Sequence, residues 1–315
     1  MSKIFNIYTS LNDIKFDKRT IILGNFDGMH IGHQKLIQKG IELSEKDSLK
    51  SMIFTFYPQI QSLLHNDFKY LISQNEKYKF LKDCGINEVL SIPFNEDIAK
   101  ISHDTFIREI LMGVLNAYHI VVGYNFTFGY KGYGKAQDLQ KYFPDSNVHI
   151  IQPVKCQGKV VSSTLIRHLL NQGKISLANK YLGHPFSISG KVIHGQKKGR
   201  FIGFPTANIN IDQKLLLPKY GVYLGNVFIK KYSEKYLSVI NIGRRPTVDS
   251  KNNITIEAHL IDFSSDIYHQ DIRIELFEYI RPIRKYSSLE NLKKAIEHDI
   301  QYALSYQYNL SNNMQ

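Results

Sequence analysis

The strongest constraint on the fold is the alternation of two patterns along the first 183 residues. Short runs rich in β-branched and aromatic residues alternate with stretches that repeat apolar residues every three or four positions. We expect strands at 20–24, 52–56, 89–92, 119–123 and 148–153. Helices are expected at 32–44, at 75–84 with Tyr78, Phe80 and Leu81 inward, and at 105–115 with Phe106, Ile110, Leu111 and Val114 inward. Strands this apolar, separated by helices, predict a parallel, doubly wound α/β sheet.

The second half of the chain has a different pattern. Runs typical of strands, at 187–194, 221–230, 236–242, 254–263 and 272–279, follow one another without a helical pattern between them. Several alternate apolar and polar residues, which predicts an antiparallel barrel or sandwich. The chain closes with a helix that Ser288 is expected to cap, and its apolar stripe is Leu289, Leu292, Ile296, Ile300 and Leu304.

The boundary between the halves is expected at Gly183. Two helical patterns, 164–172 and 175–182, precede the sequence Gly183-His184-Pro185. Glycine commonly ends a helix and proline cannot continue one. We therefore expect an N-terminal domain of residues 1–183 and a C-terminal domain of residues 184–315, each long enough to bury its own core.

Composition excludes several classes of protein. No run approaches 18 uncharged apolar residues, and the first residues lack the apolar segment of a secretory signal, so we expect a cytoplasmic protein. Cys84 and Cys156 form no disulfide framework and are expected to be buried thiols. The net charge of +12 is spread evenly: 22 basic and 16 acidic residues lie in 1–183, and 18 and 12 lie in 184–315. This even spread favours a general compositional bias or small phosphorylated ligands over nucleic acid.

The segment 24–33, Gly-Asn-Phe-Asp-Gly-Met-His-Ile-Gly-His, links an expected strand to an expected helix. Such a junction presents free backbone N–H groups and the positive end of a helix to an anion. His30 and His33 lie on one face of the first turn, where they can donate to charge developing on a phosphoryl group. Gly32 removes a side chain where a nucleotide must approach. A zinc-binding pair and two ordinary histidines remain alternatives.

A second glycine-rich segment, 194–208, reads His-Gly-Gln-Lys-Lys-Gly-Arg-Phe-Ile-Gly-Phe-Pro-Thr-Ala-Asn. Its glycines recur every four residues, and it lacks the Gly-Lys-Ser/Thr ending of a Walker A loop. A glycine-rich loop with Lys and Arg after a strand suits a phosphate chain. A basic hairpin loop without that role is the alternative.

The first segment belongs to a wider set of motifs. Together with Thr-Phe-Tyr-Pro at 55–58, Gly-Tyr-Asn-Phe-Thr-Phe-Gly at 123–129 and Ser-Ser-Thr-Leu-Ile-Arg at 162–167, it resembles the FMN adenylyltransferase module of prokaryotic bifunctional riboflavin kinase/FAD synthetases. The resemblance implies that His30 and His33 contact the ATP phosphates and that Asn125 lies in the nucleotide and Mg²⁺ site. It further implies ATP or phosphate binding by Gly24, Phe26, Asp27, Gly32, Ser163, Thr164 and Arg167. Two positions depart from the family pattern: Gln59-Ile60 stands where His-Pro is common, and Asn125 where Asp is frequent.

The second segment resembles the flavokinase signature of the same family. Tyr-Gly-Val-Tyr at 220–223, the motif at 241–248, Ile-Glu-Ala-His-Leu-Ile-Asp-Phe at 256–263 and Ile-Tyr at 267–268 follow in the family's order. The resemblance implies a six-stranded barrel in which Thr206 and Asn208 hold Mg²⁺ and ATP phosphates, and Glu257 is the general base on the ribityl hydroxyl. The remaining residues that it assigns to ATP or flavin binding are Gly195, Gly199, Arg200, Gly203 and Pro205. Ile283 departs from a position that is often acidic.

The resemblance therefore implies a bifunctional enzyme of FAD biosynthesis. It would make FMN from riboflavin and ATP, and then FAD and pyrophosphate from FMN and ATP, with Mg²⁺ at both sites. ATP, riboflavin and FMN are the expected partners, without nucleic acid, membrane or an obligate protein partner. Three alternatives remain: retention of only one activity, a class I aminoacyl-tRNA synthetase, which shares His-Ile-Gly-His and a superficially similar 159–167 segment, and a basic nucleic-acid-binding protein.

Overall fold

The computed structural model describes residues 5–64, 67–195, 198–244 and 254–312 of the 315-residue chain. The chain divides into two compact units, 1–163 and 164–315.

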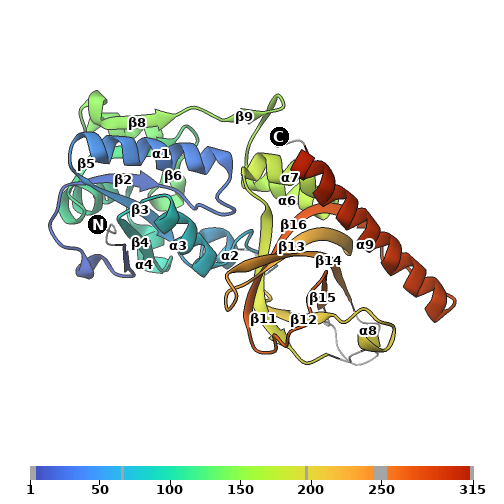
Figure 1. Ribbon diagram of the computed structural model, residues 1–315. Coiled ribbons are helices and arrows are strands. Elements are labelled where there is room, and N and C mark those ends of the chain that lie inside the picture. Colours follow the sequence, from blue (N-terminus) through green and yellow to red (C-terminus); the bar gives the residue numbers. More distant parts are fainter. Residues whose placement is uncertain (1–4, 65–66, 196–197, 245–253, 313–315) are drawn as a thin grey trace. The chain divides into compact units, whose positions relative to one another are not determined.

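A six-stranded, wholly parallel sheet forms the centre of the first unit (Figure 1). Its strand order is β1-β4-β3-β2-β5-β8, and each neighbouring pair runs in the same direction. The strands are β1 (Asn6–Tyr8), β2 (Arg19–Leu23), β3 (Lys50–Phe56), β4 (Glu88–Ile92), β5 (Ala117–Gly123) and β8 (Val148–Ile151). The predicted doubly wound sheet is confirmed, although the short edge strand β1 was not predicted.

Helices and short pieces connect these strands. The helices are α1 (Ile31–Lys46), α2 (Ile60–Leu64), α3 (Gln74–Asp83), α4 (Glu96–Lys100), α5 (His103–Thr105) and the π-helix η2 (Phe106–Val114). The shorter pieces are η1 (Leu11–Asp13), β6 (Thr127–Phe128), η3 (Tyr130–Gly132), β7 (Gly134–Lys135), η4 (Ala136–Lys141), η5 (Asp145–Asn147), β9 (Lys155–Cys156) and β10 (Lys159–Val160).

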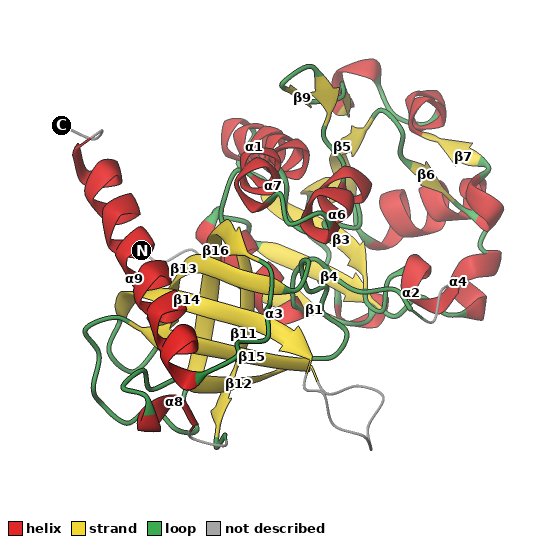
Figure 2. Cartoon of the chain, turned by 90° about the vertical axis from the view of Figure 1, so that its right-hand side faces the viewer, coloured by secondary structure: helices red, strands yellow, loops and turns green. Residues whose placement is uncertain are grey.

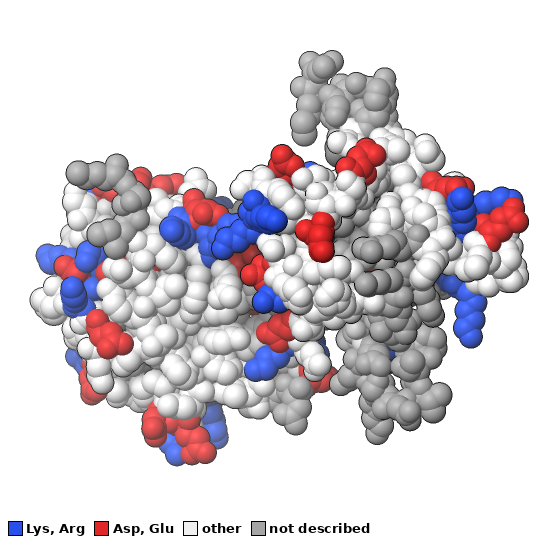
Figure 3. All heavy atoms as spheres, turned by 60° about the horizontal axis from the view of Figure 1, so that its bottom comes forward, with Lys and Arg blue, Asp and Glu red and all other residues white. Residues whose placement is uncertain are grey.

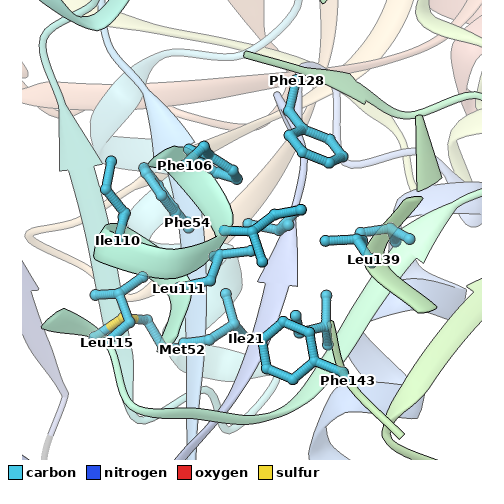
Figure 4. Close-up of a cluster of buried hydrophobic side chains, with 14 of the residues drawn as sticks. Ile21, Met52, Phe54, Phe106, Ile110, Leu111, Leu115, Phe128, Leu139 and Phe143 are labelled. Carbon is cyan, nitrogen blue, oxygen red and sulfur yellow. The ribbon is translucent and has the colours of Figure 1, made fainter. Parts of the chain in front are cut away.

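Successive residues of β2 enter two different hydrophobic clusters, one on each face of the sheet. Ile22 packs in the cluster that holds the buried residues of α1 and α3. Ile21, labelled in Figure 4 with Phe106, Ile110 and Leu111 of η2, packs in the cluster on the opposite face, and Leu23 belongs to the same cluster. Because side chains alternate along a strand, this division explains why the strands read as continuous apolar runs.

The segment predicted as an α-helix at 105–115 differs from the prediction. Its backbone hydrogen bonds join residues five apart, the spacing of a π-helix, instead of four apart. One example is the 2.9 Å bond from the Leu115 N–H to the Ile110 carbonyl. The wider turn places Leu115 in the core with Phe106, Ile110 and Leu111. Val114, predicted to face inward, is 37% exposed.

A buried ion pair lies at the amino ends of β2 and β4. Nε of Arg19 donates to Oε2 of Glu88 at 2.7 Å, and both side chains are at most 1% exposed. Arg19 also donates to the carbonyls of Lys15, Asp17 and Leu115. This single guanidinium therefore links the strands to the segments that enter the sheet.

The second unit is built around a closed antiparallel barrel of six strands (Figure 2). The order is β11-β12-β15-β14-β13-β16, formed by β11 (Phe186–Ile193), β12 (Ala207–Ile211), β13 (Gly221–Ile229), β14 (Glu234–Arg244), β15 (Ile254–Leu260) and β16 (Asp271–Arg281). The predicted barrel is confirmed. Strand β12, Ala-Asn-Ile-Asn-Ile, was not predicted because its polar composition is weak for a strand, and the expected absence of helices is wrong at the short α8 (Lys198–Phe201).

Two helices, α6 (Ser163–Asn171) and α7 (Ile175–Leu182), precede the barrel. The side chain of Asn179 accepts from the Phe186 N–H at 2.7 Å and donates to the Leu276 carbonyl at 2.8 Å, which ties α7 to β11 and β16. Gly183 ends α7 with a left-handed φ of 76°, as predicted. The compact division nevertheless falls after Ser163, the first residue of α6, rather than at Gly183, because α7 packs on the barrel.

The closing helix, α9 (Leu289–Asn312), lies outside the barrel against β14 (Figure 2). Ser288 caps it, since its Oγ accepts from the Asn291 N–H. Ala303 packs with Val222, Leu224 and Val239. The predicted stripe is wrong at its ends, where Leu289 and Leu304 are 69% and 38% exposed. Other buried contacts of α9 include Asp299, whose carboxylate accepts from Arg281.

The exposure of the two cysteines differs from the prediction. Cys84 is exposed and Cys156 half-buried, so the prediction of two buried thiols is wrong. Within the described ranges, no helix has both the length and the apolarity to cross a bilayer. Basic and acidic side chains are interspersed on the face shown in Figure 3.

The Arg19–Glu88 pair yields the first prediction. Glu88→Leu removes the buried carboxylate closest to the Arg19 guanidinium and leaves the partly exposed Asp17 at 3.7 Å, so the free energy of unfolding should fall by about 3–5 kcal/mol. Urea denaturation of the full chain measures this change. The matched control is Glu96→Leu, which removes a 90% exposed carboxylate paired with Lys100 and should cost at most about 1 kcal/mol. Equal effects of the two substitutions would contradict the prediction.

Candidate active sites

The first candidate site lies where the strand order of the parallel sheet reverses. From β2 the chain proceeds through β3 and β4 on one side and then crosses to β5 and β8 on the other. In open α/β sheets, ligands bind at the carboxyl ends of the strands beside such a reversal. The segment 24–33 leaves β2 there, and Asn125 follows the adjacent β5.

The two histidines of this segment lie against each other. Their rings stack with centroids 3.6 Å apart and planes 12° apart. Nδ1 of His30 accepts from the His33 N–H at 3.2 Å and caps α1. In the neutral form, Nδ1 of His30 is therefore the acceptor and the proton is on Nε2.

His33 is held neutral by its surroundings. Burial lowers the pKa of His33 well below its ordinary value, and the nearby charges of His30 and Lys77 lower it further. The segment thus offers imidazole donors without a permanent charge on His33. The predicted placement of both imidazoles on one face is confirmed by their stacking.

The backbone before α1 is strained and tightly supported. Phe26 and Met29 adopt left-handed φ angles of 51° and 49°, which are costly for residues with a Cβ. Oδ1 of Asp27 accepts from the Leu71 N–H at 2.9 Å, and the Asp27 carbonyl accepts from the Ser163 hydroxyl at 2.9 Å. Asp27 and Ser163 therefore hold the shape of the loop in this structure.

Two glycines leave room for rings of the same loop. A Cβ on Gly32 would lie 3.1 Å from the His30 ring, and one on Gly24 would lie 3.1 Å from the Phe26 ring. The space at Gly32 thus accommodates His30, whereas the sequence suggested that it accommodates a nucleotide.

Sequence reasoning missed Lys77 and noted Gln59 only as a departure. Both side chains are 1% exposed, and both donate to the Asn25 carbonyl, at 3.1 Å each. Lys77 stands four residues before the buried Leu81 on α3. A lysine on the inward face of a predicted helix was the available signal.

The remaining predicted residues lie as follows. Asn125 is exposed just after β5, and a Cβ on Gly123 would approach its Oδ1 to 3.4 Å. Thr164 is exposed and Arg167 half-buried on α6, in the second compact unit.

The second candidate site lies on the outer face of the barrel. Glu257 on β15 is paired with Asn208 on β12 and with Asn241 on β14. Directly opposed residues of antiparallel strands share a face, so the three side chains form a row across three strands. The next pair in register, Ile209 and Ile256, is buried on the inner face.

Glycines shape the approach to this row. A Cβ on Gly195 would lie 2.1 Å from Nδ2 of Asn208, and one on Gly199 would lie 2.3 Å from the Phe204 carbonyl. Gly203 has a left-handed φ of 89°. The Pro205 carbonyl accepts from Nδ1 of His259 at 2.8 Å, which fixes the Pro-Thr-Ala-Asn segment to the strand of Glu257. The side chain of Arg200 and residues 245–248 lie outside the described residues.

A pocket of about 100 Å³ opens beside Thr206. Pro205, Ala207 and Val192 form one part of its wall, and the end of β15 with the segment that follows it forms the rest. Those further lining residues are Leu260, Phe263, Ser264, Ser265, Asp266, Ile267 and Tyr268. Sequence reasoning missed Ser264, Ser265 and Asp266; the polar run before Ile267 was the signal that could have found them.

The donor set near Asn208 suits a hard divalent cation. Asn208 supplies an amide oxygen from a side chain only 8% exposed, and Thr206 supplies a hydroxyl. Among the described residues, no group of three or more His, Cys, Asp or Glu side chains could hold a metal. A site of few protein oxygens is the kind that Mg²⁺ completes with water and substrate phosphates.

Comparisons with known families give two matches. The model of the family described as FAD synthetase matches residues 14–165, and that of the family described as riboflavin kinase matches residues 182–307. The alternative of a class I aminoacyl-tRNA synthetase is therefore wrong, since the second half of the chain matches the riboflavin kinase family.

Whole-chain relatives agree with these matches. A bifunctional riboflavin kinase/FMN adenylyltransferase of Bacillus subtilis is 37% identical over 303 residues, which cover 93% of this chain and 94% of the relative. Proteins of the same description from Escherichia coli and Listeria monocytogenes are 37% and 33% identical, over 89% and 90% of this chain and 90% of each relative.

One solved structure is similar over nearly the whole chain. It is titled as a macrolide-efflux protein from Streptococcus pneumoniae and aligns with a TM-score of 0.87 at 30% identity. The alignment covers 95% of this chain and 98% of that one.

Proposed function

The chain belongs to the bifunctional riboflavin kinase/FMN adenylyltransferase family, and from that premise we propose that the two candidate sites carry its two reactions separately. The protein phosphorylates riboflavin to FMN and adenylylates FMN to FAD, with ATP as co-substrate of both activities. We assign adenylylation to residues 1–183 and phosphorylation to residues 184–315. The family matches at 14–165 and 182–307 support this assignment.

In the proposed kinase site, Glu257 is the general base. It accepts the proton of the primary ribityl hydroxyl while that oxygen bonds to the γ-phosphorus of ATP and the bond to ADP breaks. The register that places Glu257 beside Asn208 supports this role. Thr206 and Asn208 would hold Mg²⁺, which neutralises phosphate charge when bound. The glycines at 195, 199 and 203, with Arg200 and Pro205, would complete the ATP and flavin site.

In the proposed adenylyltransferase site, no enzyme nucleophile is required. A phosphate oxygen of FMN bonds to the α-phosphorus of ATP, and pyrophosphate leaves. Because Nδ1 of His30 accepts a hydrogen bond, the neutral ring carries its proton on Nε2, which would donate to a phosphate oxygen. The ring of His33 stacks on the ring of His30. Both would stabilise charge that develops on the phosphate oxygens.

The other residues proposed for this site provide binding contacts. Backbone N–H groups between Asn25 and Gly32 would approach the phosphates, with Asn125 at the neighbouring strand end. Ser163, Thr164 and Arg167 would bind phosphate with hydroxyls and a guanidinium fork. We also propose a cytoplasmic location, where ATP is at hand.

Glu257→Gln tests the kinase assignment. The amide cannot accept the hydroxyl proton, so FMN formation should fall by about 10²–10⁴-fold. Conversion of supplied FMN to FAD should stay near the wild-type rate. Separation of the flavins after incubation with ATP and Mg²⁺ measures both rates, and an equal loss of both in a folded variant would contradict the assignment.

Alanine at His30 and at His33 tests the other site. Each substitution removes a positioned imidazole, so FAD formation should fall by roughly 10²–10³-fold while FMN accumulates. The same flavin separation measures the effect. His168→Ala, at an exposed histidine of α6, is the control and should leave both activities unchanged. Normal FAD synthesis by the His30/His33 double variant would show that the reaction occurs elsewhere.

Truncation tests whether the kinase site is self-contained. A 164–315 fragment keeps the Asn179 bonds to β11 and β16, and it should fold and phosphorylate riboflavin. A 184–315 fragment loses those bonds and should melt at a lower temperature. Calorimetry and kinase assays on both fragments give the comparison. A folded but inactive 164–315 fragment would mean that the site needs residues of the first unit.

A further inference from the structure

One carbonyl oxygen in the loop before α1 accepts hydrogen bonds from three side chains. The oxygen of Asn25 lies 3.3 Å from Oγ1 of Thr55, 3.1 Å from Nε2 of Gln59 and 3.1 Å from Nζ of Lys77. These donors come from β3, from the turn after it and from α3. A carbonyl oxygen has two lone pairs, so three donors saturate it and hold its direction.

The ammonium of Lys77 is unusually placed. Its side chain is 1% exposed, and burial lowers the pKa of Lys77 to about 8, while the charge of Asp27 acts in the opposite direction. A buried charge costs folding free energy, and an uncharged side chain of similar volume would avoid that cost. The contacts of Lys77 with the loop suggest that its benefit is to the reaction rather than to stability.

The bonds on Asn25 also set the direction of the next backbone donor. In a trans peptide, the C=O and the following N–H point in opposite directions. The Asn25 carbonyl faces β3 and α3, so the Phe26 N–H faces away from them. Phe26 has a left-handed φ of 51°, which needs support from its surroundings.

We propose that Lys77, assisted by Gln59, is a positioning residue for FMN adenylylation that fixes the Asn25–Phe26 peptide, so that the loop's N–H groups and the His30 imidazole face the ATP phosphates. This inference rests on the function proposed for the N-terminal site. Lys77 acts through the loop and does not touch reacting atoms. Gln59 adds a second nitrogen donor to the same carbonyl.

Lys77→Met in the full-length enzyme tests the proposal. Methionine fills a similar volume without a charge or a donor, so kcat for FMN adenylylation should fall by about 10–100-fold. Riboflavin phosphorylation in the same preparation should change by less than about twofold. The melting temperature should stay the same or rise, because a buried charge is removed.

Two further variants sharpen this test. Lys82→Met, on the exposed side of α3, is the matched control and should leave both activities unchanged. Gln59→Leu removes one neutral donor and should reduce adenylylation less than Lys77→Met does.

The pH dependence separates positioning from packing. The charge of Asp27 acts on the pKa of Lys77, whereas burial, assisted by the charge of Lys77, lowers the pKa of His33, so His33 is already neutral near pH 8. As pH rises through about 8, wild-type Lys77 loses its charge. The ratio of wild-type to Lys77→Met kcat for adenylylation should therefore be largest near pH 7 and shrink toward higher pH.

The titration of Lys77 should also make the stability of the wild-type protein depend on pH. The folded pKa lies below the unfolded value, so between about 8 and 10.5 the unfolded state binds more protons and wild-type stability rises with pH. The advantage of Lys77→Met in melting temperature should thus be largest below pH 8 and decline above it.

These measurements distinguish the inference from its premise. Wild-type enzyme that forms FMN but no FAD overturns the proposed function and the inference with it. Active wild-type enzyme with undiminished adenylylation by Lys77→Met overturns the inference alone. A loss of activity that merely follows a lower melting temperature, with a kcat ratio independent of pH, assigns Lys77 a packing role and also overturns it.

Discussion

The burial of β2 on both faces is the constraint on which the first unit depends. Ile21 and Leu23 pack into one cluster and Ile22 into the other, so the strand cannot shift without disrupting both. Arg19 anchors its amino end through Glu88 and three carbonyls. Because the strand is fixed, the peptide that leaves its carboxyl end enters α1 in a set place, and the stacked imidazoles follow from that.

The barrel positions its polar residues by a different means. Closure pairs every strand on both sides, and the pairing register places Glu257 between Asn208 and Asn241. The alternate positions of the same strands, such as Ile209 and Ile256, are buried in the core on the inner face. Chemistry in the first unit relies on loop peptides and helix ends, whereas in the second it relies on cross-strand register.

The sequence predicted most of the fold because its patterns are local. Apolar runs, helical stripes and the Gly183 stop are set by neighbouring residues, and the structure contains them. The misses have non-local causes. Strand β12 is polar and is defined by its partners, and α9 buries Ala303 and Asp299 instead of Leu289 and Leu304 because of what the barrel offers.

The candidate sites show the same division. His30, His33, Asn208 and Glu257 were predicted because short motifs and a family resemblance contain them. The bonds from Gln59 and Lys77 to the Asn25 carbonyl could not be predicted, since they join residues 34 and 52 positions apart in the chain. A buried lysine is visible in a sequence only as a polar residue on an apolar stripe.

The row Asn208–Glu257–Asn241 restricts how this half of the protein can change in length. Inserting or deleting one residue within β15 would turn Glu257 toward the barrel interior and bring Ile256 or Ala258 to the outer face. Length changes that keep the row intact are therefore expected in the connections between strands. The number of residues in each strand beside the row is therefore constrained, whereas the lengths of the loops can vary.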